Sequence, residues 1–223
     1  WDSKYLADNR PAHGDDWYLA QDYVQTILRH ISPRQSVLDA GCGTGGLLSF
    51  LYRRGFNVVG IDTSTQAAAI ANRLFPEERA QVGSIETIPF PERSFDGYIS
   101  IGSWEYPEGG PGMAAREAAR VVKPSGVLVM VVPRPNLLRR MFYLPARRLR
   151  DVFKRLSGSK RRILVRWFSV GDLRDLLEGA GFEILEVRPH DLNYTGAHFG
   201  LWVDWPFLRG GPDYRLNVPG RII

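Results

Sequence analysis

The sequence predicts an α/β fold: a doubly wound sheet, mostly parallel, with one antiparallel strand near its C-terminal edge. Three observations predict it. Short apolar runs of strand length alternate with helical stretches, which is typical of a parallel sheet covered on both faces. The first run leads into a glycine-rich turn that opens a helix. The last two runs are joined by a connection short enough for antiparallel strands.

The N-terminal half supplies the first strands and helices. Residues 15–31 carry apolar side chains at helical spacing, with acids at the start and Arg29 and His30 at the end, so one amphipathic helix is expected there. Strands are expected at 37–40, 57–61 and 80–83, with helices at 46–54 and 64–74 between them.

The C-terminal half repeats the alternation. Ser169 and Asp172 have the spacing of a capping box and predict the start of a helix that ends near Gly179. Strands are expected at 94–101, 127–132, 182–187 and about 199–205, and a further helix at 113–121. We expect one domain over 1–223, with a helical insertion at 134–166 after the fifth strand.

Composition limits the classes of protein that fit. Of the 223 residues 44% are hydrophobic and 24% charged, which is ordinary for a soluble globular protein. No apolar run is long enough to span a bilayer. A single cysteine, Cys42, excludes an intrachain disulfide and suits a reducing compartment, so a cytoplasmic location is expected. The chain starts at Trp1, which leaves upstream processing open. No metal-ligating constellation is visible, so no metal is expected.

The glycine-rich turn follows an acid, Asp39, at the end of the first strand. Gly41 and Gly43 allow backbone angles and a close ligand approach that other residues forbid. Their spacing also suits a dinucleotide, but a carboxylate there would repel a pyrophosphate. Asp39 suits a cationic ligand such as S-adenosylmethionine, which carries an ammonium and a sulfonium. The plain alternative is a solvated acid beside a glycine turn, and Cys42 is interpreted as a packing residue rather than a nucleophile.

With four further stretches the chain resembles the class I S-adenosylmethionine-dependent methyltransferases, in particular those with a UbiE/UbiG-like core. The stretch Val37–Gly45 looks like the first motif of that family. The others that resemble its motifs are Gly60–Ser64, Pro89–Asp96, Arg120–Leu128 and Gly181–Glu183. The resemblance covers about residues 16–133 and 167–205 and implies a Rossmann-like fold. An NAD(P)-dependent oxidoreductase is disfavoured by Asp39 and by the lack of a dehydrogenase-type Tyr/Lys pair.

The resemblance implies S-adenosylmethionine as cofactor and S-adenosylhomocysteine as product. Asp62 then accepts from the ribose hydroxyls, with a helix N-cap as its alternative role. Ser84 stands where the family usually has an aspartate that accepts from the adenine amine, so Ser84 or Glu86 takes that role, or packing holds the base. The cofactor-binding residues expected are Asp39, Gly41, Cys42, Gly43, Asp62, Thr63, Ser84, Ile85, Glu86 and Ser100.

Catalytic residues are less well defined, because sulfonium is already an activated methyl donor and positioning alone supplies much of the rate. Candidates for a general base are His190, His198, Glu105 and Tyr106, which lie near or beyond strand ends; each also suits a structural role. Tyr5 is a candidate to close over the cofactor. The fourth strand is followed by none of the motifs of amine-directed nucleic-acid methyltransferases.

The insertion at 134–166 is the basic part of the chain. It holds 12 of the 29 Lys and Arg residues and one of the 24 acids, so the remainder is mildly acidic. Two short helices are expected, with Leu and Phe on one face and arginines on others. We interpret it as a lid that docks on an anionic membrane, which would make the protein peripheral at the inner membrane face. The alternatives are an ordinary solvated lid and a site for RNA or another polyanion.

These features predict methyl transfer to an O, C or N atom of a small hydrophobic or lipid-like acceptor. Nucleic acid is disfavoured as a partner because no recognition motif appears. A methyltransferase-like scaffold without activity is the alternative that Ser84 and the missing obvious base leave open, and the oligomeric state stays open as well.

Overall fold

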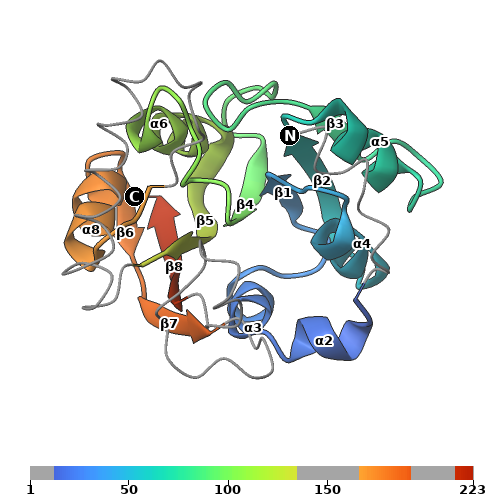
Figure 1. The fold of residues 1–223 in the computed structure, drawn as a ribbon, viewed down its shortest axis with the longest axis horizontal. Coiled ribbons are helices and arrows are strands. Elements are labelled where there is room, and N and C mark those ends of the chain that lie inside the picture. Colours follow the sequence, from blue (N-terminus) through green and yellow to red (C-terminus); the bar gives the residue numbers. More distant parts are fainter. Residues whose placement is uncertain (1–12, 135–165, 192–213, 223) are drawn as a thin grey trace, which may run out of the picture.

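The structure, a computed structural model, describes residues 13–134, 166–191 and 214–222. Its strands form one sheet in the order β3-β2-β1-β4-β5-β8-β6, with β7 paired to β8 (Figure 1). The strands are β1 Ser36–Ala40, β2 Asn57–Asp62, β3 Ala80–Val82, β4 Phe95–Ile101, β5 Val122–Pro133, β6 Phe182–Ile184, β7 Arg188–Asp191 and β8 Tyr214–Ile222. The helices are α2 Asp15–Leu19, α3 Asp22–His30, α4 Gly46–Arg53, α5 Thr65–Asn72, α6 Pro111–Val121 and α8 Val170–Glu178.

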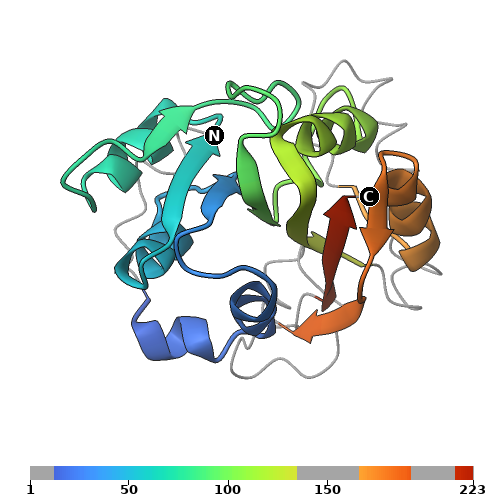
Figure 2. The same cartoon turned by 180° about the vertical axis from the view of Figure 1, so that it is seen from behind.

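The sheet separates two hydrophobic cores. On β5, Leu128 and Met130 pack in the core beneath α6 and α8, whereas the alternate residues Val129 and Val131 pack in the core beneath α3, α4 and α5. This alternation follows from the period of two along a strand. Figure 2 shows the same layers from behind. The prediction of a mostly parallel sheet covered on both faces is confirmed: β1 to β5 are parallel, and β8 runs antiparallel to β5.

The N-terminal helix predicted as one piece is two. α2 ends at Leu19, and Gln21 takes an extended conformation as the N-cap of α3. Gln21 is buried, and its side-chain amide donates to the carbonyl of Trp17 at 2.9 Å, which satisfies a group freed by the break. The break lets two faces be buried at once: Tyr18 packs on Phe50 of α4, while α3 lies beneath β5.

The C-terminal edge differs from the prediction in which residues form it. The antiparallel strand between β5 and β6 is Tyr214–Ile222, a stretch for which no strand was predicted. The strand expected at about 199–205 lies outside the described residues. β6 ends at Ile184 rather than at Val187. The capping box of Ser169 and Asp172 is confirmed, with both reciprocal hydrogen bonds formed.

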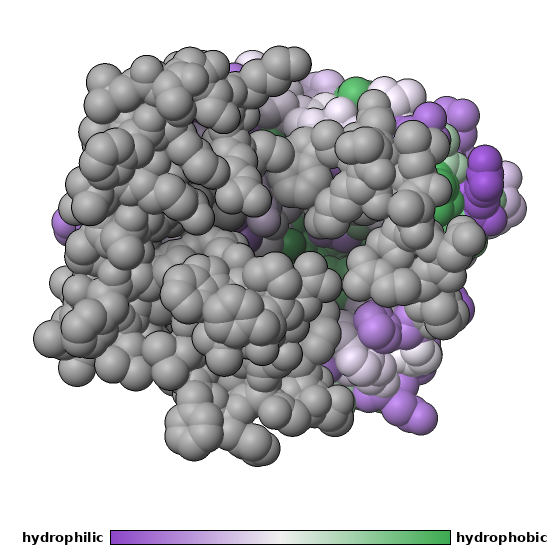
Figure 3. All heavy atoms as spheres, in the orientation of Figure 1, coloured by the Kyte–Doolittle hydropathy of each residue, from purple (hydrophilic) through white to green (hydrophobic). Residues whose placement is uncertain are grey.

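The insertion at 134–166 lies outside the described residues except for its first and last residue. Both are placed at the end of the sheet where β4 and β5 finish. The backbone N–H of Arg166 donates to the Glu105 carbonyl at 2.9 Å, and its guanidinium donates to the carbonyl of Pro107. On the face shown in Figure 3, the described surface that can be seen is mostly hydrophilic, with a few hydrophobic residues visible.

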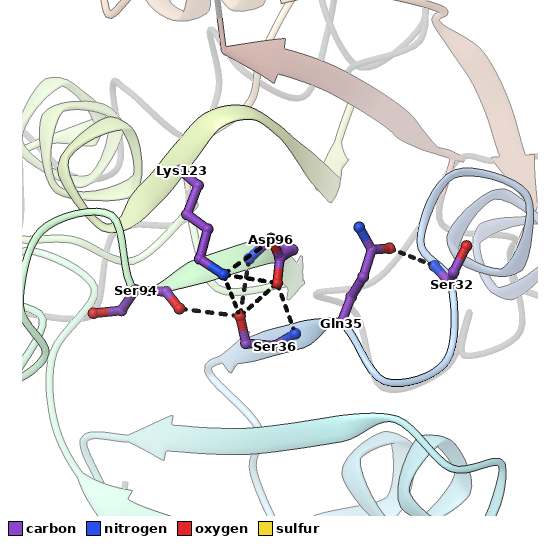
Figure 4. A network of polar contacts seen from close by, with 6 residues as sticks. All are labelled: Ser32, Gln35, Ser36, Ser94, Asp96 and Lys123. Carbon is purple, nitrogen blue, oxygen red and sulfur yellow. Dashed lines mark hydrogen bonds and ion pairs between the residues drawn. The ribbon is translucent and has the colours of Figure 1, made fainter.

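The opposite edge of the sheet, where β1, β4 and β5 begin, is held by a polar network (Figure 4). Asp96 accepts from the backbone N–H of Ser36 at 2.9 Å, from its hydroxyl at 2.7 Å and from Lys123 at 3.0 Å. Burial opposes ionisation of Asp96, but these hydrogen bonds and the ammonium outweigh it and lower its pKa. The network therefore joins three strands at their amino ends.

Candidate active site

The glycine-rich turn joins β1 to α4 at the carboxyl edge of the sheet. Gly41 and Gly43 have positive φ angles of 92° and 54°, which glycine adopts without strain. The N–H groups of Gly41 and Cys42 both donate to the Ile61 carbonyl, at 2.8 and 2.9 Å. The turn is therefore tied to β2, and its first amides are used inside the protein. By helix geometry, the amides left for a ligand are those of the first turn of α4.

Gly41 also allows the loop after β4 to approach. A Cβ added to Gly41 would overlap the side chain of Ser103, and a side chain at this positive φ would be strained in any case. Ser103, in the loop after β4, thus lies directly against the glycine turn. Two loops that are far apart in sequence share one edge of the sheet, as the carboxyl ends of neighbouring parallel strands do.

Asp39 is the most unusual group at this edge. It is 2% exposed, and its Oδ2 atom has no hydrogen-bond partner among the described residues. Burial, and then the nearby charge of Asp62, raise the pKa of Asp39 to about 7. A buried carboxylate without a partner is costly, and a cation placed beside it removes the cost. Asp39 is therefore suited to a positively charged ligand.

Asp62 is the last residue of β2 and hydrogen-bonds to the backbone of the glycine-rich turn. Its Oδ2 accepts from the N–H of Gly43 and its Oδ1 from the N–H of Ser64, both at 2.9 Å. The N-cap of α5 is Ser64, whose hydroxyl accepts from the N–H of Ala67. A carboxylate has about four lone-pair sites, so Asp62 keeps two for hydroxyl donors such as those of a ribose.

The loop after β3 carries the next predicted residues. The Ser84 hydroxyl accepts from the N–H of Glu86 at 3.1 Å, and Ile85 is buried beside it. The Glu86 carboxylate accepts from the N–H groups of Gly109 and Glu108, at 2.6 and 3.1 Å. Glu86 therefore joins this loop to the one after β4. Ser84 keeps its O–H as a donor and one lone pair as an acceptor.

Comparison with known proteins gives the site its context. A family model described as a methyltransferase domain matches residues 38–130. An uncharacterized methyltransferase of Synechocystis is 31% identical over 163 residues, covering 72% of this chain and 71% of that protein. The chain belongs to the class I S-adenosylmethionine-dependent methyltransferases.

Other relatives agree with this assignment. A 2-methyl-6-phytyl-1,4-hydroquinone methyltransferase of Synechocystis is 34% identical over 139 residues, but the match spans only 42% of that protein and 53% of this chain. Among solved structures, a SAM-dependent methyltransferase from Methanosarcina mazei shares the fold, with a TM-score of 0.69 at 19% identity, covering 89% of this chain and 97% of that one. The methyltransferase fold is thus common to proteins of very different sequence.

The residues present fit the cofactor of the methyltransferase. The unpartnered Asp39 oxygen suits the ammonium of S-adenosylmethionine, Asp62 has acceptor sites for a ribose diol, and Ile85 offers an apolar surface close to Ser84. When bound, S-adenosylmethionine supplies a methyl group on a sulfonium. The protein's own part is to hold the ends of that molecule and to exclude water from the reacting atoms.

Two of the predicted cofactor-binding residues, Ser100 and Cys42, make contacts inside the protein. The Ser100 hydroxyl is fully buried and donates to the Ala40 carbonyl at 2.7 Å, so it joins β4 to β1. Cys42 is buried, its thiol lies where a Cβ of Gly60 would be, and burial raises its pKa above the usual range. A packing role for this thiol agrees with both facts. Thr63 is exposed beside Asp62.

The candidate bases fall on different parts of the methyltransferase. Glu105 is buried and Tyr106 half-buried in the loop after β4, next to the glycine turn. His190 lies in β7, opposite Arg215 of β8, and its side chain is not described. His198 and Tyr5 lie outside the described residues. Of the four candidates, Glu105 and Tyr106 are thus the two that lie in the same loop as Ser103, the residue that contacts Gly41.

Sequence reasoning missed one residue of this edge. Tyr18 of α2 reaches the glycine turn, since a Cβ added to Gly46 would overlap its hydroxyl oxygen. The sequence analysis gave Tyr18 no role beyond its place within the helix expected at 15–31. Nothing in its spacing showed that the helix breaks at Gln21 and turns Tyr18 toward α4.

Two negative findings apply to the described residues. Within them no group of three or more His, Cys, Asp or Glu side chains could hold a metal ion. No helix in the same parts of the chain is long and apolar enough to cross a membrane.

Proposed function

We propose that the methyltransferase acts on an O, C or N atom of a small hydrophobic or lipid-like acceptor, which enters beneath the basic segment 134–166. One observation carries the proposal: the chain leaves β5 at Arg134 and is tied back, through Arg166, to the loop after β4. Both ends of the segment therefore lie at the edge of the sheet that carries Asp39 and the glycine turn.

The composition of that segment supports the nature of the acceptor. Its sequence carries Leu, Met and Phe at the spacing typical of a helix, with arginines at the positions between them. An amphipathic segment of this kind can place its apolar side chains toward an acceptor and its arginines toward solvent or a membrane. The name of the Synechocystis relative contains a phytyl hydroquinone, an acceptor with a hydrocarbon chain, and that agrees with an apolar entrance.

The residues that the proposal assigns have separate tasks. Asp39 accepts from the cofactor ammonium and Asp62 from the ribose, while Ser84 and Ile85 contact the adenine end. Glu105 and Tyr106 then face the acceptor from the loop after β4. Holding donor and acceptor in line contributes up to about 7–11 kcal/mol in favourable cases, so a base is needed only for an acceptor that must lose a proton.

A methyl-transfer assay tests this function. The protein is incubated with S-adenosylmethionine labelled in the methyl group and with a prenylated quinol, a water-soluble phenol, or RNA. We expect label in the organic phase with the quinol, and none with Asp62→Ala. Label in RNA alone would favour the polyanion-directed alternative. Cofactor binding without transfer to any acceptor, including a lipid extract, would favour the scaffold.

Membrane docking is tested by flotation with vesicles. Wild-type protein is expected to float with vesicles rich in phosphatidylserine and not with phosphatidylcholine alone. Replacing Arg147 and Arg148 by Ser should reduce recovery several-fold, because each basic residue near an anionic surface contributes about 1 kcal/mol. The matched control replaces Arg73 and Arg116, which are exposed outside the segment. Equal losses in both variants would exclude a specific docking surface.

A further inference from the structure

The loop after β4 has a buried inner part and an exposed outer part. Trp104 is fully buried and meets the ring of Tyr98 edge-on at 6.4 Å, and Glu105 is 1% exposed. Glu108 and Gly109, in contrast, are exposed. Packing therefore fixes the inner part, whereas the position of the outer part depends on the hydrogen bonds that its backbone makes.

Glu86, in the loop after β3, accepts hydrogen bonds from this outer part. Its Oε1 accepts from the N–H of Gly109 at 2.6 Å and its Oε2 from the N–H of Glu108 at 3.1 Å. Hydrogen bonds to an ionised acceptor are about twice as strong as those between neutral groups. A Cβ added to Gly109 would overlap Oε1 of Glu86 and the sulfur of Met113. The glycine thus leaves the space that lets the carboxylate approach.

The loop that carries Glu86 is itself held by α6. Arg120 donates to the Ile88 carbonyl at 2.9 Å, and Glu117 accepts from the N–H of Ile88 at 2.7 Å. The side chain of Glu86 therefore extends from an anchored backbone. A change at residues 84–86 is passed through this side chain to the outer part of the loop after β4.

We propose that Glu86 is a positioning residue, through which the loop that takes the adenine end of the cofactor orders the loop that faces the acceptor. The inference rests on the proposed function, in which Ser84 and Ile85 contact the adenine and Glu105 and Tyr106 face the acceptor. Both oxygens of Glu86 already accept from the acceptor loop, so Glu86 acts through that loop and not on the reacting atoms. An acceptor then meets an ordered loop only when the cofactor is bound.

Hydrogen exchange followed by mass spectrometry reports on both loops of the whole protein without an acceptor. The probe is methylthioadenosine, which carries the adenine but lacks the amino-acid end of the cofactor. In the wild type, the probe should slow exchange in peptides covering 84–88 and 106–110. In Glu86→Ala it should still slow exchange at 84–88. Exchange at 106–110 should be about tenfold faster than in the wild type, with or without the probe, as expected when a hydrogen bond to a charged group is lost.

A second variant breaks the same contact from the other side. Gly109→Ala keeps the charge of Glu86 but displaces its carboxylate, so it should match Glu86→Ala, and the double variant should add little. This variant keeps the test in force if Glu86→Ala is unstable. The matched control is Glu108→Gln, which changes an exposed side chain of the same loop, keeps the backbone N–H and should exchange as the wild type does.

The outcomes separate this inference from the proposed function. If the probe slowed exchange at 106–110 in Glu86→Ala as much as in the wild type, the role of Glu86 would be overturned. Slower exchange at 84–88 alone in the wild type would overturn it as well. If neither methylthioadenosine nor S-adenosylhomocysteine slowed exchange at 84–88 in the wild type, the cofactor placement itself would be wrong, and the inference would fall with it.

Discussion

Asp39 lies at the carboxyl ends of the parallel strands and Asp96 at their amino ends. The two carboxyl groups differ in how many hydrogen-bond and charge partners they have. Asp96 accepts four hydrogen bonds from Ser36 and Lys123, and its pKa is lowered. Asp39 is more deeply buried, lacks a partner for one oxygen among the described residues, and has a raised pKa. Side chains of the protein itself supply the partners of Asp96 at the amino ends of the strands. At the carboxyl ends, a ligand is needed to supply the missing partner of Asp39.

The contrast also shows that shape alone is a poor guide to the site. A hollow of about 430 Å³ lies at the amino edge, where its lining includes Arg29, His30, Asp96 and Ser125. Arg29 there already pairs with Glu186, as Asp96 does with Lys123. A buried oxygen that has no partner among the described residues lies at the other end of the strands, on Asp39. The candidate site is therefore marked by this oxygen of Asp39, and not by the hollow.

The largest expected effect comes from Asp62→Ala. The change removes the acceptor for the N–H groups of Gly43 and Ser64 as well as the proposed contact with the ribose. We expect the Kd of S-adenosylhomocysteine to rise about 100-fold or more, since two hydrogen bonds to a charged group are lost along with the shape of the turn. Calorimetry measures the Kd, and circular dichroism checks that the variant is folded. A loss below threefold would contradict the placement.

Asp39→Asn should separate binding from stability. Burial raises the pKa of Asp39 to about 7 in the folded protein, whereas the unfolded chain releases this proton near the ordinary aspartate pKa of 3.8. The folded state then binds more protons within this window, so the free energy of unfolding falls as pH rises through it. At pH 8 the neutral variant should be more stable than the cofactor-free wild type by about 1–3 kcal/mol.

The same variant should bind S-adenosylhomocysteine about 10- to 100-fold more weakly, because an amide cannot pair with an ammonium as a carboxylate does. Denaturant unfolding at pH 5 provides the control: only the part of the window below pH 5 then contributes, so the difference in stability should be much smaller than at pH 8. If Asp39→Asn were less stable than wild type at pH 8, or bound S-adenosylhomocysteine normally, Asp39 would not be a binding site for the cofactor ammonium.

Asp96→Asn should have the opposite pattern. It weakens hydrogen bonds that join β1, β4 and β5 at the amino edge, so the free energy of unfolding should fall by about 1–3 kcal/mol. Ligand Kd values should stay within twofold of wild type. Lys123→Met, which removes the other member of the ion pair, should behave alike. A change in cofactor affinity with either variant would mean that the two edges are coupled.

The smallest expected effect is a gain. Ser84→Asp introduces the acid that the family resemblance leads us to expect at this position, and its oxygen can still accept from the Glu86 N–H. A charged acceptor binds an amine more strongly than a hydroxyl does, so affinity for S-adenosylhomocysteine should rise about threefold. Inosine-containing analogues, which lack the amine, report whether the gain arises at the adenine. A gain for those analogues as well would place the effect elsewhere.

Much of the cofactor side could be predicted from the sequence because its signals are local. The acid and glycines of 39–45, the acid after β2 and the capping box at Ser169 are each read within a few residues. β8 could not be predicted in this way: Pro219 and Gly220 interrupt its apolar pattern, and its role depends on pairing with β5, far away in sequence. Tyr18 was missed for a similar reason, because its contact with Gly46 requires the break at Gln21.

The place of β8 in the sheet has a consequence for how the chain is made. β6 pairs with β8, and β8 alone joins it to β5 in the strand order. On the ribosome, β1 to β5 emerge long before residues 214–222, so the cofactor half of the sheet can form while the other half still lacks its connecting strand. We therefore expect nascent chains to acquire affinity for the cofactor before the acceptor side is assembled, an order of events set by topology alone.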